Sequence, residues 1–226
     1  CDFGNGLWTG KKPPFQKVGV IRNTNFTKEG KLDDTDIVFL DVEKSQYAKR
    51  KLQFGDIIIE KSGGGPKQPV GRVVIFDKKD GEFSFSNFTS IIRVKSPKQL
   101  DFTYLHRYLF FLYISGETEK MQSHSTGIRN LKFDEYKSIK IPFPTSQEQK
   151  RIVSVLDKTF AAIDKAKANT EKNLQNVREF FESYLHRLFE SGEWETKTVG
   201  EVCGEIFAGG DAPKNAFSIE PTSKFQ

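Results

Sequence analysis

Residues 61–72 combine three consecutive glycines with side chains that commonly contact phosphate groups and base edges. The stretch "KSGGGPKQPVGR" lies between two β-branched runs, "DIIIE" and "VVIF". Glycine lets a backbone approach a ligand closely, and lysine, serine, glutamine and arginine can reach phosphate oxygens. The residues of this stretch that could do so are Lys61, Ser62, Lys67, Gln68 and Arg72.

The glycine stretch does not have the pattern of a nucleotide-binding loop. A Walker loop or a dinucleotide fold needs a helix directly after the glycines, because the N-terminal amides of that helix bind the phosphate. Here Pro66 and Pro69 follow, and then the strand-like run "VGRVVIF". The pattern therefore excludes ATP or NAD binding and favours a long hairpin or sheet connection that contacts DNA phosphates. The alternative is a solvated loop in which the glycines serve only turn geometry.

Two more polar segments could contact a nucleic acid. They supply Arg22, Asn23 and Asn25 from "VIRNTNF", and Ser123, His124, Ser125 and Arg129 from "MQSHSTGIRN". Asn, Ser and Arg side chains can read base edges in the major groove. The alternative for each is again a solvated loop, and for Arg129 and Asn130 a structural role at the base of the helix that follows.

A metal-dependent nuclease is the catalytic alternative. Asp56, followed by Asp77 and Lys79, has the order of two metal-binding carboxylates and a lysine. However, Asp77 lies in "DKKDG", which predicts a hairpin turn and not a central strand. No Ser-His-Asp or Cys-His pattern is present, and the two cysteines, Cys1 and Cys203, have no neighbours at metal-ligand spacing. We therefore expect no catalytic or metal-binding residues and no disulfide framework, as in a cytoplasmic protein.

Positive charge is concentrated in the first part of the chain. Lys+Arg minus Asp+Glu is 24 − 17 = +7 for residues 1–145, 8 − 7 = +1 for 146–192 and 3 − 6 = −3 for 193–226. A basic first block favours a polyanionic partner. No run of residues is long and apolar enough to predict a membrane span.

The elements that carry these residues alternate between short strands and two helices. Residues 15–94 consist of β-like runs separated by turns, such as "FQKVGVI", "IVFLDV" and "SIIRV". A helical face follows, with Gly116 as its stop and Leu105, Tyr108, Leu109, Leu112 and Tyr113 as its apolar residues. The segment "FDEYKSI" predicts a single helical turn. This order predicts an α+β domain over residues 1–144, rich in strands.

A long helix is predicted over residues 145–192. Pro142 and Pro144 end the first domain, and either Thr145 with Glu148 or Ser146 with Gln149 could form a capping box. Neither glycine nor proline occurs from there to Ser191, which gives about 45 residues, or about 68 Å of helix.

The apolar residues of this helix repeat at alternating steps of three and four, which is the pattern of a coiled coil. The seam consists of Val153, Leu156, Phe160, Ile163, Lys167, Thr170, Leu174, Val177, Phe181, Tyr184 and Leu188. A parallel pair would stack Lys167 on Lys167, whereas an antiparallel pair centred between Lys167 and Thr170 places Ile163 opposite Leu174. We therefore expect an antiparallel partner helix, and an amphipathic helix lying on its own domain is the alternative.

Residues 193–226 are predicted to return to strands and turns. Cys203 precedes "GEIFAGG" much as Cys1 precedes "DFGNGLWTG", which suggests that a second repeat of the first domain begins here and that it is incomplete.

Together, three segments resemble the specificity (S) subunit of type I restriction-modification enzymes. They are "FGDIIIEKSGGGPKQPVGRVVIF", "STGIRNLKFDEYKSIKIPFPTSQEQKRIVSVLDKTF" and "WETKTVGEVC". The resemblance implies a target-recognition domain that reads one half of a split DNA sequence, followed by a conserved helix that acts as an antiparallel coiled-coil spacer. It also implies that methyltransferase (M) subunits dock on the helices, that restriction (R) subunits join them, and that catalysis and cofactors belong to those subunits.

Two other functions are compatible with the sequence. The first is a coiled-coil scaffold whose globular head binds protein, and the second is the nuclease described above. DNA retention at low salt would separate the specificity subunit from the scaffold, and cleavage with Mg²⁺ would identify the nuclease.

Overall fold

A computed structural model describes residues 1–7, 12–65, 68–125, 127–204 and 209. The chain divides into two compact units, residues 1–165 and 166–226. Among the described residues, no helix is long and apolar enough to cross a membrane.

The described residues of the first unit form ten strands in three sheets. The strands are Asp2–Asn5 (β1), Phe15–Ile21 (β2), Val38–Glu43 (β3), Ile57–Glu60 (β4), Ser62–Gly64 (β5), Val73–Ile75 (β6), Phe83–Phe85 (β7), Thr89–Arg93 (β8), Gln122–Ser125 (β9) and Ile128–Leu131 (β10). The sheets have the strand orders β1-β8-β4-β6, β3-β2-β7 and β5-β10-β9.

Helices connect and cover these sheets. They are Lys44–Arg50 (α1), Phe102–Ile114 (α2), Phe133–Lys137 (α3) and Ser146–Glu190 (α4), with 3-10 turns at Asn23–Asn25 (η1) and Glu117–Met121 (η2). Helix α4 begins in the first unit and continues into the second, which also contains a short helix, Val199–Val202 (α5). The predicted class, a mixed strand-rich domain followed by one long helix, is confirmed.

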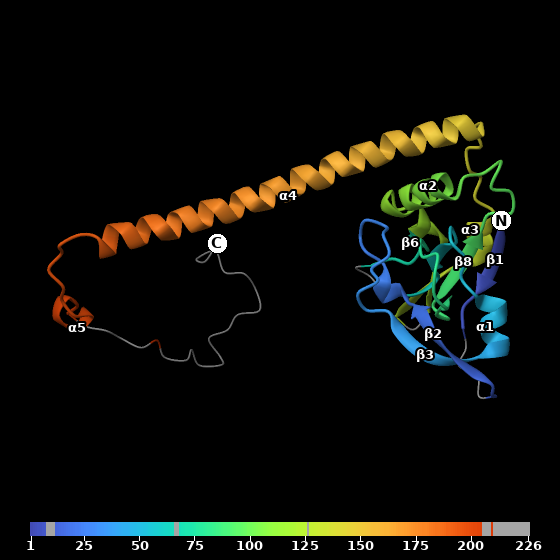
Figure 1. The fold of residues 1–226 in the computed structure, drawn as a ribbon, viewed down its shortest axis with the longest axis horizontal. Coiled ribbons are helices and arrows are strands. Elements are labelled where there is room, and N and C mark those ends of the chain that lie inside the picture. The colour runs from blue at the N-terminus through green and yellow to red at the C-terminus, as the bar shows by residue number, and fades with distance from the viewer. Residues whose placement is uncertain (8–11, 66–67, 126, 205–208, 210–226) are drawn as a thin grey trace. The chain divides into compact units, whose positions relative to one another are not determined.

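The four-stranded sheet is buried on both faces, and the alternation of side chains along β4 decides which residues face which layer. Ile57 and Ile59 pack with Leu105 and Leu109 of α2, whereas Ile58 packs on the other face with Phe85 of β7. All three isoleucines are fully buried, and each contributes about 1.5–3 kcal/mol of transfer free energy. Figure 1 shows this layering, with α2 above β8 and β1 and with β2 and β3 below them.

Local sequence signals explain the limits of α2. The Asp101 carboxylate accepts hydrogen bonds from the backbone amides of Thr103 and Tyr104 at 2.8 and 3.0 Å, which caps the first turn. Gly116 follows the last turn with φ of 78°, a left-handed conformation that glycine adopts without strain. The predicted helix, its stop residue and the single turn at α3 are therefore confirmed.

The start of α4 is capped by Thr145, as one of the two predicted capping boxes requires. The Glu148 amide donates to the Thr145 hydroxyl at 3.3 Å. The Glu148 carboxylate instead binds Arg151, at 2.7 and 2.8 Å. Gln149 is fully buried and joins three segments, because its oxygen accepts from the Asp101 amide and its nitrogen donates to the carbonyls of Gln99 and Pro144.

One helix was not predicted, and two local predictions were wrong. Helix α1 was not expected. The "DKKDG" segment is not a hairpin turn, because β6 pairs with β4 while β7 pairs with β2 in a different sheet. Residues 199–202 form a helical turn where strands and turns were expected, since the Thr198 side chain and Glu201 complete a capping box. Most of the predicted second repeat, residues 205–208 and 210–226, lies outside the described residues.

Candidate nucleic-acid interface

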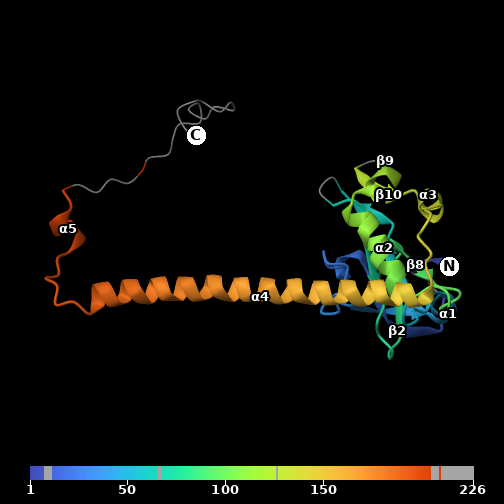
Figure 2. The same cartoon turned by 90° about the horizontal axis from the view of Figure 1, so that it is seen from above.

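The third sheet brings together two of the polar segments that the sequence singles out. Strand β5 belongs to the glycine stretch, and β9 and β10 belong to the segment that contains Arg129. In this sheet, Arg129 lies opposite Gly64 and Asn130 lies opposite Ser62. The Ser62 hydroxyl donates to the side-chain oxygen of Asn130 at 2.5 Å. Figure 2 shows β9 and β10 side by side, near α3.

An irregularity in the pairing lies at the centre of this sheet. The register between β10 and β5 shifts between Arg129 and Asn130. Such irregularities place an extra residue on one strand of a pair, and they are common beside binding sites. Arg129 and Asn130 are consecutive in β10, whereas their partners Gly64 and Ser62 are two residues apart in β5. The extra residue is therefore Gly63 of the glycine stretch, and β10 keeps a regular pairing with β9.

Lys61 closes one end of the same surface. Its ammonium group donates to the side-chain oxygen of Asn5 at 2.9 Å, and its backbone carbonyl accepts from the Leu131 amide at 2.8 Å. Partial burial lowers the pKa of Lys61 from its usual value, because the charged form loses hydration. The position of this cation is therefore fixed by the domain.

A hollow of about 350 Å³ lies beside these residues. Its lining consists of Lys61, Ser62, Asn87, Phe88, Asn130 and Leu131. Phe88 is 44% exposed, so an apolar side chain lies beside the polar residues of this hollow. Asn5, Asn87 and Phe88 were not among the predicted site residues, although the polar and aromatic turn "SNF" between β7 and β8 was a usable signal.

Arg72 has a structural role that the sequence did not reveal. Its guanidinium binds the fully buried Glu60 carboxylate at 2.8 and 3.0 Å, and it donates to the carbonyls of Phe26 and Asn23 at 3.0 Å. The Arg72 side chain is only 13% exposed. The buried carboxylate and carbonyls occupy this guanidinium, so it supports the loops instead of reaching outward.

The segment around η1 is held by the same network. The Asn23 amide donates to Glu60 at 3.2 Å, and an added Cβ on Gly63 would lie 3.1 Å from that amide. Gly63 has φ of 94°, a conformation that favours glycine, and a larger residue there would also press on the Asn23 amide. Asn23 therefore links the η1 segment to the glycine stretch.

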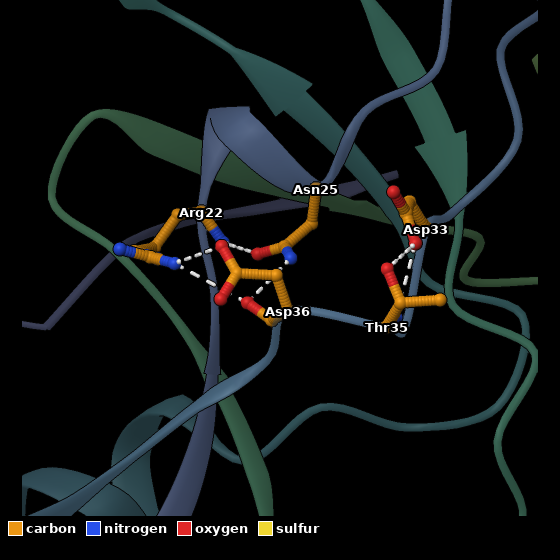
Figure 3. Close-up of polar contacts among 5 residues, drawn as sticks. All are labelled: Arg22, Asn25, Asp33, Thr35 and Asp36. Atoms are coloured by element: carbon orange, nitrogen blue, oxygen red, sulfur yellow. Dashed lines mark hydrogen bonds and ion pairs between the residues drawn. The ribbon is translucent and has the colours of Figure 1, made fainter.

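Arg22 and Asn25 stabilise the turn that follows β2 (Figure 3). The Arg22 guanidinium binds the Asp36 carboxylate at 3.1 Å. The Asn25 oxygen accepts from the Arg22 amide at 2.9 Å, and its nitrogen donates to the Asp36 carbonyl at 3.0 Å. Asn25 is 1% exposed, so its side chain cannot reach a ligand in this conformation.

The other predicted contact residues are distributed around the third sheet. Ser123 is exposed on β9, and its hydroxyl lies 3.4 Å from the Asn130 carbonyl. Gln68 is exposed and its backbone pairs with Gly65. His124 and Ser125 belong to β9, but their side chains lie outside the described part of the structure, as does Lys67.

Of the two carboxylates in the nuclease alternative, only that of Asp56 is paired with a cation among the described residues. Asp56 is 1% exposed, and its two oxygens accept from Arg93 at 2.7 and 2.6 Å. This pairing raises the pKa of Arg93, chiefly through the hydrogen bond. Asp77 is exposed on the connection after β6. Within the described ranges, no three His, Cys, Asp or Glu side chains are grouped so that they could hold a metal ion.

The predicted seam of α4 has two environments. Val153 packs partly against the core around Leu105, and Leu156 and Phe160 are half-buried. The later apolar positions are exposed by 45–64%, namely Ile163, Leu174, Val177, Phe181, Tyr184 and Leu188. An apolar row of this length is typical of a helix that pairs with a partner.

The family model and the curated relatives that match this chain all describe type I restriction specificity proteins. The family model described as "Type I restriction modification DNA specificity domain" matches residues 1–175. The type I restriction enzyme EcoKI specificity subunit of Escherichia coli strain K12 is 33% identical over 171 residues, which cover 74% of this chain and 34% of that protein. A putative type I restriction enzyme specificity subunit of Haemophilus influenzae is 32% identical over 148 residues, 64% of this chain and 32% of that one.

The chain thus spans about a third of the length of these curated relatives. Among solved structures, a chain from a study titled "Structural basis underlying complex assembly and conformational transition of the type I R-M system" matches with a TM-score of 0.52. The match covers 78% of this chain and 40% of that chain at 19% identity, and it is a likeness of fold alone.

Proposed function

The chain belongs to the family of type I restriction-modification DNA specificity domains, and we propose that it recognises one half of a bipartite DNA target. The observation that supports this function best is the third sheet, where Ser62, Arg129 and Asn130 from two distant segments lie together. Arginine, asparagine and serine are side chains that distinguish bases through hydrogen bonds in the major groove.

The contacts are divided between positioning and reading. Lys61 and Arg129 neutralise phosphates or contact guanine, and Ser62, Gln68, Ser123 and Asn130 contact base edges. Lys67, His124 and Ser125 remain in the proposed contact set from their place in the sequence. Arg22, Asn23, Asn25 and Arg72 act indirectly, since their hydrogen bonds hold the segments from which the contacts come.

Helix α4 acts as a spacer in this proposal. Two copies pair antiparallel through the seam, so that a recognition domain lies at each end, and the methyltransferase and restriction subunits assemble on the helices. The chain itself is non-catalytic, holds no cofactor and works in the cytoplasm. The proposed domain limits are residues 1–144, 145–192 and 193–226.

A coiled-coil scaffold that binds protein is the second candidate. The observation in its favour is the row of exposed apolar residues on α4, including Val177, Phe181 and Tyr184. This candidate predicts that substitutions in the third sheet do not change the affinity of the chain for its protein partner. It also predicts that the chain does not bind duplex DNA.

Fluorescence anisotropy with a mixed-sequence duplex at low salt separates the two candidates. We expect Lys61→Glu with Arg129→Glu to abolish DNA binding. The control is Lys49→Glu with Lys95→Glu, which makes the same change of charge at exposed residues outside the third sheet. Equal losses in the two double variants would contradict the proposed surface, and no binding by the unmodified chain would favour the scaffold.

A further inference from the structure

The first unit has an apolar groove of about 510 Å³ that the DNA-recognition proposal does not use. Its walls come from residues 28–31, α2 and the first part of α4. The apolar lining consists of Phe110, Ile114, Phe160, Ala161 and Ile163. Six charged side chains, three of each sign, surround it: Lys28, Lys31, Arg107, Glu29, Asp157 and Asp164.

Two aspartates place this groove on one flank of the α4 seam. Asp157 and Asp164 directly follow the seam residues Leu156 and Ile163, and they lie one heptad apart. The Arg107 guanidinium donates to Asp157 at 2.8 Å, and the Lys31 ammonium donates to Asp164 at 3.1 Å. This flank of α4 therefore faces the recognition domain.

The corresponding flank near the end of α4 is basic and apolar. The residues that directly follow the seam positions Val177 and Tyr184 are Arg178 and Leu185. In an antiparallel pair of helices related by a two-fold axis, this flank of one helix lies against the same flank of its partner. Arg178 of a second copy would thus approach the side of α4 that carries the groove.

The register of the seam determines which residues of α4 lie opposite Arg178 of the second copy. When Ile163 lies opposite Leu174, Phe160 lies opposite Val177, so Arg178 comes level with the stretch between Asp157 and Asp164. These carboxylates are 50% and 56% exposed, and each has lone pairs left after its existing ion pair. An arginine suits such a site, because its stem packs on apolar side chains while its guanidinium binds carboxylates.

We propose that the groove between α2 and α4 is a docking site for Arg178 and the neighbouring turn of α4 of a second copy of this chain. The inference rests on the antiparallel pairing proposed above and adds that the second helix contacts the recognition domain itself, through Ile114 and Phe110. The contact holds each domain at a fixed angle to the helical spacer. The spacing of the two half-sites is then set by a rigid assembly.

The dissociation constant of the dimer, measured by sedimentation equilibrium, tests this contact with two matched pairs of variants. Ile114 and Phe111 are both exposed on α2, at 62% and 54%, but only Ile114 lines the groove. Arg178 and Arg187 are exposed on α4, and Arg187 lies on the opposite flank of the seam. We expect Ile114→Lys and Arg178→Glu to weaken the dimer about tenfold or more, and Phe111→Lys and Arg187→Glu to change it less than about twofold.

The outcomes separate this inference from the pairing on which it depends. If the chain forms a dimer that Ile114→Lys weakens no more than Phe111→Lys does, the groove is not the docking site and the pairing stands. If the chain stays monomeric at every concentration, both are wrong. Circular dichroism confirms that each variant keeps its helices, and all of the changed side chains are exposed.

Discussion

The Ser62 hydroxyl and the Asn130 side-chain oxygen are joined by a 2.5 Å hydrogen bond across a separation of 68 residues. The bond connects the glycine stretch to the β9–β10 hairpin. Two polar segments that are far apart in the sequence therefore form one surface. Gly64 lies opposite Arg129 in the same sheet. In our proposal this shared surface, and not either loop alone, reads the DNA.

Removal of the Lys61 charge is predicted to weaken DNA binding by a similar factor for all sequences. Lys61→Ala removes one proposed phosphate contact, so the slope of log K against log salt concentration should become about one unit shallower. Titrations by fluorescence anisotropy at several salt concentrations measure this slope. Lys49→Ala on α1 is the matched control, and an equal effect there would show that only net charge matters.

Loss of Arg72 is predicted to destabilise the domain strongly. Arg72→Met leaves the fully buried Glu60 carboxylate without its charged partner, which costs about 3–5 kcal/mol of unfolding free energy. The exposed pair of Lys95 with Asp2 is the control, since solvent screens this pair and Lys95→Met should destabilise the domain far less than Arg72→Met. Urea unfolding measures both values, and similar costs for the two variants would refute the structural role assigned to Arg72.

His106 is predicted to make the stability of the domain depend on pH. Burial lowers the pKa of this imidazole from 6.5 to about 4, and the side chain is 1% exposed. Between these values the unfolded chain binds more protons than the folded one. Stability is therefore complete above pH 6.5 and falls by up to about 3 kcal/mol as the pH drops towards 4.

The variant His106→Gln isolates this effect from other titrating groups. Gln keeps a hydrogen-bond donor for the Val73 carbonyl, which lies 3.2 Å from the His106 ring nitrogen. Urea unfolding of both proteins from pH 7.5 to 4.5 should give a smaller loss for the variant. If the unfolding free energies of the two proteins fall in parallel from pH 7.5 to 4.5, the loss of stability does not come from His106.

A shorter α4 is predicted to change the spacing of the half-sites but not their sequence. Deletion of residues 167–173 removes one heptad, or about 10 Å of helix, and this equals about three base pairs of DNA. Selection of bound sequences from duplex pools with variable spacers measures the preference. An unchanged spacer would rule out α4 as the element that sets the distance.

The sequence predicted the elements that depend on local signals. The strand runs, α2 with its stop at Gly116 and the long α4 follow from periodicity and from turn residues. Helix α1 was missed because "KSQYAKR" is short and is stabilised by packing, with Tyr47 in the core beside Val18. The prediction of a hairpin at "DKKDG" was wrong because turn residues show that the chain reverses between β6 and β7, but not that β6 pairs with β4 and β7 with β2.

The site was predictable only as a set of residue types. Lys61, Ser62 and Arg129 were identified from their segments, and the structure places them in and beside one sheet. Arg72 looked equivalent to Lys61 in the sequence, but its partner Glu60 is twelve residues away and fully buried. Which charges are satisfied inside a protein depends on tertiary contacts, and these cannot be derived from residue type and spacing.

Selection of bound sequences from random duplex DNA tests the central claim most directly. The chain and its Asn130→Ala variant are compared, each alone and with the methyltransferase subunit of its system. We predict that the unmodified chain enriches two symmetric half-sites and that the variant loses preference at one position in each half, worth about 1–3 kcal/mol. No enrichment under either condition, or the same enriched sequence with the variant, would contradict the claim that the β5–β10–β9 surface reads DNA.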